Sequence, residues 1–149
     1  MESKRFAMEE VTERLGVTAR TLHYYEEIGL LAGVERTAGG HRLYSEEIVL
    51  ELEHILRLKN VLGCSLQEIR SILEAERQLT EIRHFYQLAE TSEEGRGELL
   101  SRASELLGQQ IRLIDDKVRG MLEMKERFER RLSRVNEIRG GGSSKSNGE

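Results

Sequence analysis

The sequence contains no tryptophan, no proline and one cysteine, Cys64, and only 5% of its residues are aromatic. One cysteine excludes an intramolecular disulfide and a metal site of several thiolates from the same chain, so we expect a reducing cytoplasm. No apolar run reaches the roughly 18 residues that span a bilayer, and no apolar signal segment follows the charged start MESKRF. The 149 residues therefore predict a cytoplasmic chain without membrane contact, made of one small domain plus an extension.

The charge balance argues mildly against nucleic-acid binding. The formal net charge is −4, and up to Glu76 there are 9 Lys and Arg against 14 Asp and Glu. Neutralisation of phosphates supplies much of the affinity for DNA, so a DNA-binding function has to depend on where the cations lie. Four of them, Arg14, Arg20, Arg36 and Arg42, fall close to the two helices described next.

Two short helices joined by a tight turn are predicted near the start of the chain. Residues 8–15 place Val11 and Leu15 four apart, and Gly16 ends that helix. Thr18 is a good N-cap for a second helix that runs to about residue 28. This is the helix-turn-helix pattern, which many small helical bundles share.

The second helix has two different faces. One face is apolar and suited to packing, and the other carries side chains that bond bases or phosphates. The apolar side holds Leu22, Tyr25 and Ile28, and the polar side holds Arg20, His23, Tyr24 and Glu27. The pattern alone fits a DNA-contacting face and an ordinary solvated face equally well.

A hairpin and two further helices follow. Residues 34–44 form two short arms around Ala38-Gly39-Gly40, with Arg42 and Tyr44 on one face. The alternative for that pair is an exposed cation and a tyrosine packed on the next helix. That helix begins at Ser45 and runs to about residue 62. SLQE, residues 65–68, is a capping box for a fourth helix that buries Leu66, Ile69, Ile72 and Leu73. Helix-turn-helix, hairpin and helices in this order indicate a winged helix.

The second half of the chain has a longer helical pattern. A short amphipathic helix is predicted over residues 79–89, and TSEE at 91–94 caps another that Gly95 and Gly97 weaken. An a/d heptad seam then spans about four heptads, a rod roughly 43 Å long. Its members are Leu107, Ile111, Ile114, Val118, Met121, Lys125, Phe128, Leu132 and Val135. Such a rod either folds back on the preceding helices or pairs with a second copy, which its length favours. GGGSSKSNGE at the end is predicted to be a flexible polar tail.

VTERLGVTARTLHYYEEIGLL, RTAGGHRLYSEE and LGCSLQEIRSIL resemble the DNA-binding domain of the MerR family of bacterial transcription regulators. The resemblance covers about residues 5–76, and its motifs are specific. It implies a mostly α chain with an N-terminal winged helix-turn-helix domain, a small β-hairpin wing and a long C-terminal dimerisation helix in an antiparallel coiled coil. We accordingly expect a DNA-binding domain at 5–76, a helical connector at 77–100, a coiled-coil helix at 101–139 and a tail at 140–149.

The same resemblance implies the DNA-contacting residues. Base or backbone contacts are expected from the second helix, and phosphate contacts from its N-terminus, the wing and the end of the third helix. These residues are Thr18, Arg20, Thr21, His23, Tyr24, Tyr25, Arg36, Arg42, Tyr44 and Lys59.

Three departures from the family pattern bear on these contacts. His23 stands where an arginine is frequent, which makes a contact there weaker and pH-dependent. The proline common after the LL pair is absent, which loosens the entry into the wing. Ala7 occupies the usual Ser or Thr cap of the first helix, at a cost of about 1 kcal/mol.

As function, the resemblance implies a homodimer on a pseudo-palindromic operator in double-stranded promoter DNA. The dimer would activate or repress by distorting that DNA for RNA polymerase, in response to an effector. No cysteines lie where metal-sensing members have them, and Cys64 fits a packed thiol better than a redox sensor. Phe85 and Tyr86 are candidates for a small-molecule effector region, or else they cap the dimer core.

The pattern of the chain does not indicate an enzyme. We find no nucleophile paired with a base, no phosphate loop, no metal constellation and no cofactor motif. An effector-independent DNA-architectural or protein-interaction module is the alternative function.

Overall fold

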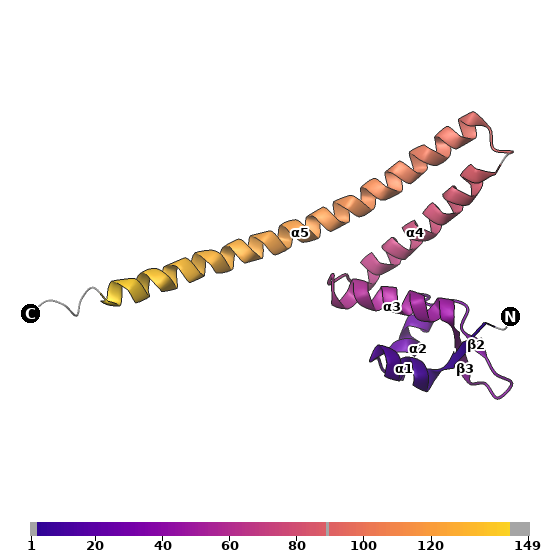
Figure 1. The fold of residues 1–149 in the computed structure, drawn as a ribbon, viewed down its shortest axis with the longest axis horizontal. Helices are drawn as coiled ribbons and strands as arrows, with labels where there is room; N and C mark the ends of the chain where they lie inside the picture. The colour runs from indigo at the N-terminus through magenta and orange to yellow at the C-terminus, as the bar shows by residue number, and fades with distance from the viewer. Residues whose placement is uncertain (1–2, 89, 144–149) are drawn as a thin grey trace, which may run out of the picture. The chain divides into compact units, whose positions relative to one another are not determined.

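The computed structural model describes residues 3–88 and 90–143, which form two compact units, Met1–Glu74 and Ala75–Glu149. The first unit holds three short strands, three complete helices and the start of helix α4 (Leu66–Gln87), which continues into the second unit. The second unit is helical apart from the turn between α4 and α5 (Glu93–Ser143), where residues 88 and 90–92 are not helical (Figure 1). Across these two ranges, no helix has the length and apolar character needed to cross a bilayer.

The helix-turn-helix prediction is confirmed. Helix α1 is Met8–Leu15 and α2 is Ala19–Glu27. Gly16 ends α1 at φ 67°, a left-handed conformation that glycine adopts without steric cost. Thr18 caps α2 by accepting a hydrogen bond from the Thr21 amide at 3.1 Å. At the predicted weak cap of α1, the Glu10 carboxylate accepts from the Ala7 amide at 3.2 Å.

The predicted hairpin is part of a three-stranded antiparallel sheet. Strands β2 (Glu35–Arg36) and β3 (Arg42–Ser45) form the hairpin, and Gly40 in its turn has φ 83°. A further strand, β1 (Arg5–Ala7), pairs with the other edge of β3 and gives the order β1-β3-β2. We did not predict β1, because three residues are too few to show a periodic pattern.

Helix α3 is Glu46–Asn60, and its ends show which sequence signals were reliable. Its cap is confirmed, since the Ser45 hydroxyl accepts from the Ile48 amide at 3.2 Å. It ends two residues before the predicted end, and its buried side chains include Ile55 and Leu58. The SLQE capping box is confirmed by reciprocal bonds between Ser65 and Glu68, at 3.0 and 3.1 Å.

One apolar core holds the first unit together. It takes side chains from every helix and from β1 and β3, and those with the least exposure are Val11, Leu22, Tyr25, Tyr44, Leu52, Ile55 and Ile69. Cys64 lies in the same core with 6% of its surface exposed, in agreement with a packed thiol. The core fixes α2 and the sheet relative to each other within this unit.

The second half of the chain has fewer breaks than predicted. Helix α4 runs without interruption over Leu66–Gln87, so a separate helix over residues 79–89 was a wrong prediction. The predicted end of that helix, Ala89, lies outside the described residues. No proline or glycine, the residues that most disfavour a helix, occurs within α4. Nothing in the sequence therefore ends the helix at Glu76.

Helix α5 is Glu93–Ser143, a helix of 51 residues about 76 Å long. It begins before the predicted residue 101 and passes through Gly95 and Gly97; the Ser92 hydroxyl caps it by accepting from the Gly95 amide at 3.0 Å. Residues 140–143, predicted as tail, are helical, and the rest of that tail is outside the described residues. Contacts between α4 and α5 in the second unit include the Arg102 guanidinium and the Gln78 side-chain oxygen, 3.1 Å apart.

Candidate DNA interface

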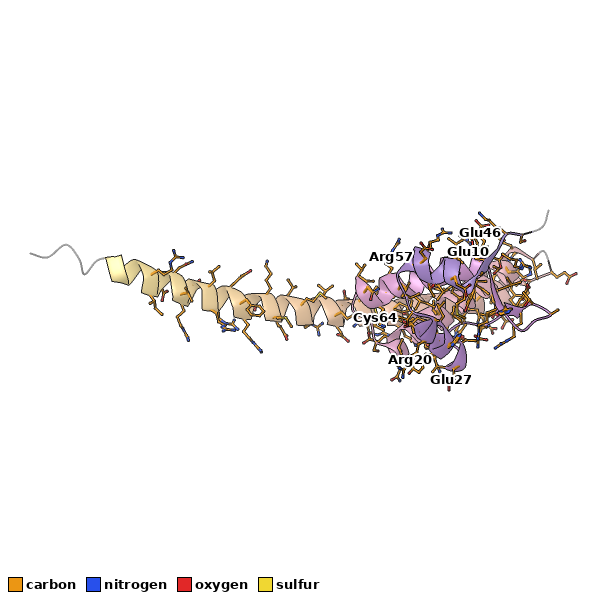
Figure 2. All side chains as sticks on the ribbon, turned by 90° about the horizontal axis from the view of Figure 1, so that it is seen from below. Glu10, Arg20, Glu27, Glu46, Arg57 and Cys64 are labelled. Carbon is orange, nitrogen blue, oxygen red and sulfur yellow. The ribbon has the colours of Figure 1, made fainter. Side chains whose placement is uncertain are left out.

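Helix α2 presents the two faces that its sequence predicts. Leu22 and Tyr25 are each 1% exposed and pack in the core, whereas Arg20, His23 and Tyr24 point away from it. Figure 2 labels Arg20 at the surface of α2. No acidic side chain of the described chain lies within ion-pair distance of Arg20, so its guanidinium is free for an anion.

The N-terminus of α2 carries two hydroxyls that contact each other. The Thr18 and Thr21 side-chain oxygens are 2.9 Å apart, and Thr18 also accepts the amide bond that caps the helix. No acidic residue occupies the first turn of α2, so the positive end of its dipole is not offset locally. These hydroxyls lie where a phosphate oxygen would be favoured.

A network of charged groups joins the wing to α2. The Glu26 carboxylate accepts from Arg42 Nε at 2.7 Å and lies 3.9 Å from the Arg36 guanidinium. Arg42 also contacts His23 Nε2 at 3.0 Å, and Arg36 donates to the Gly40 carbonyl at 3.3 Å. The network brings three of the predicted contact residues together, with an acidic residue between them.

Glu26 belongs to this network but was not among the residues that we predicted. The helical pattern does not single out Glu26, because its partners are distant in the sequence. Arg36 and Arg42 lie 10 and 16 positions further along the chain. No local pattern connects residues so far apart, so only the folded position of the wing identifies Glu26 as the residue that holds it.

Tyr25 and Tyr44 both pack in the core. For Tyr44 this argues against the expected DNA contact, whereas Tyr25 also lines the pocket described next, so its contact stays a prediction. Each side chain is 1% exposed. Burial raises the pKa of the Tyr44 hydroxyl, and the nearby Arg42 guanidinium opposes that shift. The Tyr44 hydroxyl is buried without a hydrogen-bond partner in the described chain and lies near the charges of Arg42, Glu26 and Arg36, so it is not exposed to a phosphate.

A shallow pocket of about 220 Å³ connects α2 with the end of α3. Its lining residues are Arg20, Thr21, Tyr24, Tyr25, Lys59 and Leu66. The Lys59 ammonium is 3.4 Å from the Tyr25 hydroxyl and 5.9 Å from the centre of its ring. Two cations and several hydroxyls in one hollow suit an anion of phosphate size.

Part of the acidic charge of the first unit lies at another surface. A hollow of about 560 Å³ is lined by Glu35, Glu46, Glu47 and Glu51 together with Arg5, which pairs with Glu35 at 2.9 Å. Burial raises the pKa of Glu51. In Figure 2, Glu46 lies at the opposite edge of the unit from Arg20. These four carboxylates therefore lie away from α2, whereas Glu26 and Glu27 belong to α2 itself.

Three other candidate sites were considered in the sequence: a metal site, the possible effector region and the seam of α5. Within residues 3–88 and 90–143, no group of three or more His, Cys, Asp or Glu side chains converges as a metal site would require. Phe85 and Tyr86 are 50% and 40% exposed, and the Arg96 guanidinium lies 5.6 Å from the Tyr86 ring. The heptad seam of α5 is exposed along its length, from 49% at Val118 to 61% at Met121 among its apolar members.

Comparison with known proteins agrees with this geometry. The model of the MerR HTH family regulatory proteins matches residues 6–76. The chain is 43% identical over 122 residues to the HTH-type transcriptional regulator YfmP of Bacillus subtilis, covering 82% of this chain and 86% of YfmP. It is 47% identical over 79 residues to the nodulation protein NolA of Bradyrhizobium elkanii, which is 53% of this chain but only 36% of NolA.

A solved structure supports the same fold. A MerR-family transcriptional regulator from Bacillus cereus superposes with a TM-score of 0.57 at 24% identity, covering 98% of this chain and 88% of the other. YfmP is a transcriptional regulator by name, in line with the prediction that the chain is not an enzyme. With its helix-turn-helix, its wing and its match to YfmP over most of both chains, the protein belongs to the MerR family of transcription regulators.

Proposed function

We propose that this regulator acts in the cytoplasm as a homodimer that binds a pseudo-palindromic operator in promoter DNA and distorts it. The observation that carries the proposal is the exposed face of α2, where Arg20, His23 and Tyr24 lie next to the wing cations. A helix of this kind enters the major groove while the wing follows the neighbouring backbone.

The contact residues divide by chemistry. Arg20 has the free guanidinium that reads guanine edges or binds a phosphate, and His23 and Tyr24 add donors on the same face. Thr18, Thr21 and Lys59 lie around the α2 N-terminus and the anion-sized pocket, where they would meet the backbone. Arg36 and Arg42 would bind phosphate from the wing, with Glu26 fixing where they point.

The long exposed seam of α5 supports dimerisation. Its apolar members are about half exposed, and no residue from 118 to 142 is covered by the described part of the chain. A helix with an uncovered heptad seam is stabilised by a second copy, and the family relationship favours an antiparallel coiled coil. Two DNA-binding units in one dimer then match the two halves of a pseudo-palindrome.

The dimer would distort the promoter DNA. The resulting DNA shape would decide whether RNA polymerase can engage the promoter, and so whether the regulator activates or represses. Bending a site costs on the order of a few kcal/mol, which additional phosphate contacts repay. An effector would act on the second unit, where the half-exposed Phe85 and Tyr86 are the candidate contacts. A regulator without an effector would show the same DNA affinity and the same level of transcription with and without cell extract.

The test is binding of the purified protein to the DNA upstream of its own gene at several salt concentrations. Arg20→Ala and Tyr24→Ala should each weaken selective binding, Arg20→Ala by about 5- to 150-fold, because a good base contact is worth about 1–3 kcal/mol. Arg57→Ala removes the same charge from α3 at the opposite edge of the unit and is the matched control. Equal loss in both arginine variants, or poor binding to every fragment, would contradict the proposal.

A further inference from the structure

The heptad seam of α5 is flanked by two rows of residues whose charges differ along the helix. One row follows the d positions and contains Gly108, Asp115, Leu122 and Glu129. The other precedes the a positions and contains Gln110, Lys117, Met124 and Arg131. In an antiparallel pair of helices each row faces its own counterpart on the other copy, so these residues decide which alignments bring like charges together.

We propose that two copies pair through α5 in one register, with Val118 opposite the partner's Met121. This inference rests on the proposed homodimer and specifies its geometry. The same alignment places Ile111 opposite the partner's Phe128 and Leu107 opposite the partner's Leu132. Every seam residue from Leu107 to Leu132 then faces another seam residue, so the alignment covers nearly all of the exposed stripe.

Charge selects this register over its neighbours. Here Asp115 faces the partner's Leu122, and Lys117 faces the partner's Met124, so no like charges meet. Sliding one helix by a heptad in one direction brings Asp115 against the partner's Glu129 and Lys117 against the partner's Arg131. Sliding it in the other direction brings Asp115 and Lys117 each against its own counterpart. Both shifts create repulsive pairs across the interface.

Larger shifts lose apolar contact instead. A shift of two heptads avoids like charges, but it leaves either Leu107 and Ile111 or Phe128 and Leu132 without a seam residue opposite. These four side chains are 50–60% exposed in the single chain. Leaving two of them in water on each copy gives up apolar burial, which is the main stabilising contribution in a coiled coil.

The register is tested by disulfide formation in the full chain. Ile111 and Phe128 are 17 positions apart on one helix, about 25 Å, so thiols there cannot react within a chain. An I111C/F128C variant should oxidise to a covalent dimer in most molecules. The wild-type protein is the negative control for cross-linking, because its only cysteine, Cys64, is buried. The single variant I111C would cross-link if the helices were parallel and in register, since Ile111 would then face its own counterpart. The single variant L122C would cross-link in the one-heptad shift that brings Leu122 against the same residue of the partner. Light scattering gives the oligomeric state.

The outcomes separate the register from the dimer. Covalent dimer with I111C/F128C, and little with I111C or L122C, supports the register. Efficient cross-linking of L122C or of single I111C overturns it while leaving the homodimer in place. A protein that is dimeric by light scattering but not cross-linked in I111C/F128C also overturns it. A monomer at micromolar concentration would contradict the homodimer itself.

Discussion

Removal of the Glu26 charge should change DNA binding and stability in opposite directions. Glu26 lies between Arg42 and Arg36, and the Arg42 and Glu26 side chains are only 22% and 27% exposed. This partial burial and the 2.7 Å contact place the pair at the upper end of exposed ion pairs. Glu26→Gln should therefore lower the free energy of unfolding by about 1 kcal/mol.

The same substitution frees the wing cations for DNA. If Arg42 then neutralises one additional phosphate, the slope of log affinity against log salt should become steeper by about 0.9. Affinity for non-specific DNA at low salt should rise, and selectivity for the operator should fall because Arg42 is no longer oriented. Fluorescence anisotropy with operator and scrambled duplexes over a salt series measures both, and urea titration measures stability.

Glu27→Gln is the matched control. Glu27 is the next residue of α2, is exposed, and loses the same charge without a wing partner. Both variants should gain a little affinity from the change in net charge, but only Glu26→Gln should change the salt slope and the urea midpoint. Identical behaviour of the two variants would refute a role for the Glu26 network in positioning the wing.

Three further predictions concern single positions. Tyr44→Phe should leave DNA affinity within about threefold and stability unchanged or higher, because it removes a buried hydroxyl that has no partner in the described chain. A larger loss of affinity would show that the Tyr44 hydroxyl does contact a phosphate. Gly16→Ala should destabilise by about 1 kcal/mol at its φ of 67°, whereas Gly120→Ala in the middle of α5 should stabilise by about 0.5–1 kcal/mol, and opposite signs in thermal melts check the pair. Lys125→Leu replaces the one polar seam residue and should tighten the proposed dimer about tenfold in sedimentation equilibrium, and weaker association would show instead that Lys125 is required for alignment.

The sequence was informative wherever the structure depends on neighbouring residues. The glycine after α1, the Thr18 and Ser45 caps and the Ser65 capping box all act over three or four positions, and each lies where we predicted. The seam of α5 was predicted for the same reason, since a heptad is a local repeat.

The features that we missed depend on contacts between distant segments. Strand β1 exists because Phe6 and its neighbours pair with β3, almost 40 positions away. The resemblance to a family placed Tyr25 and Tyr44 among the contact residues, but the periodicity of α2 already put Tyr25 on the apolar side, and the structure agrees with the periodicity. Glu26 joins the candidate site only because the wing folds beside it.

If the proposed homodimer is the active form, the uncovered second half of α5 makes the function depend on how much of the protein the cell contains. Residues 118–142 gain no burial from the described part of their own chain, and most of the stability of a helix in a protein comes from packing of its apolar face. Below the dissociation constant of the dimer, this segment would fray and become a substrate for proteases, while newly made chains that find a partner would be protected. Because dimer concentration then varies with the square of chain concentration, a twofold fall in synthesis would lower the active form about fourfold. A promoter controlled by such a protein would respond to the rate at which its regulator is made as well as to any molecule that the regulator binds.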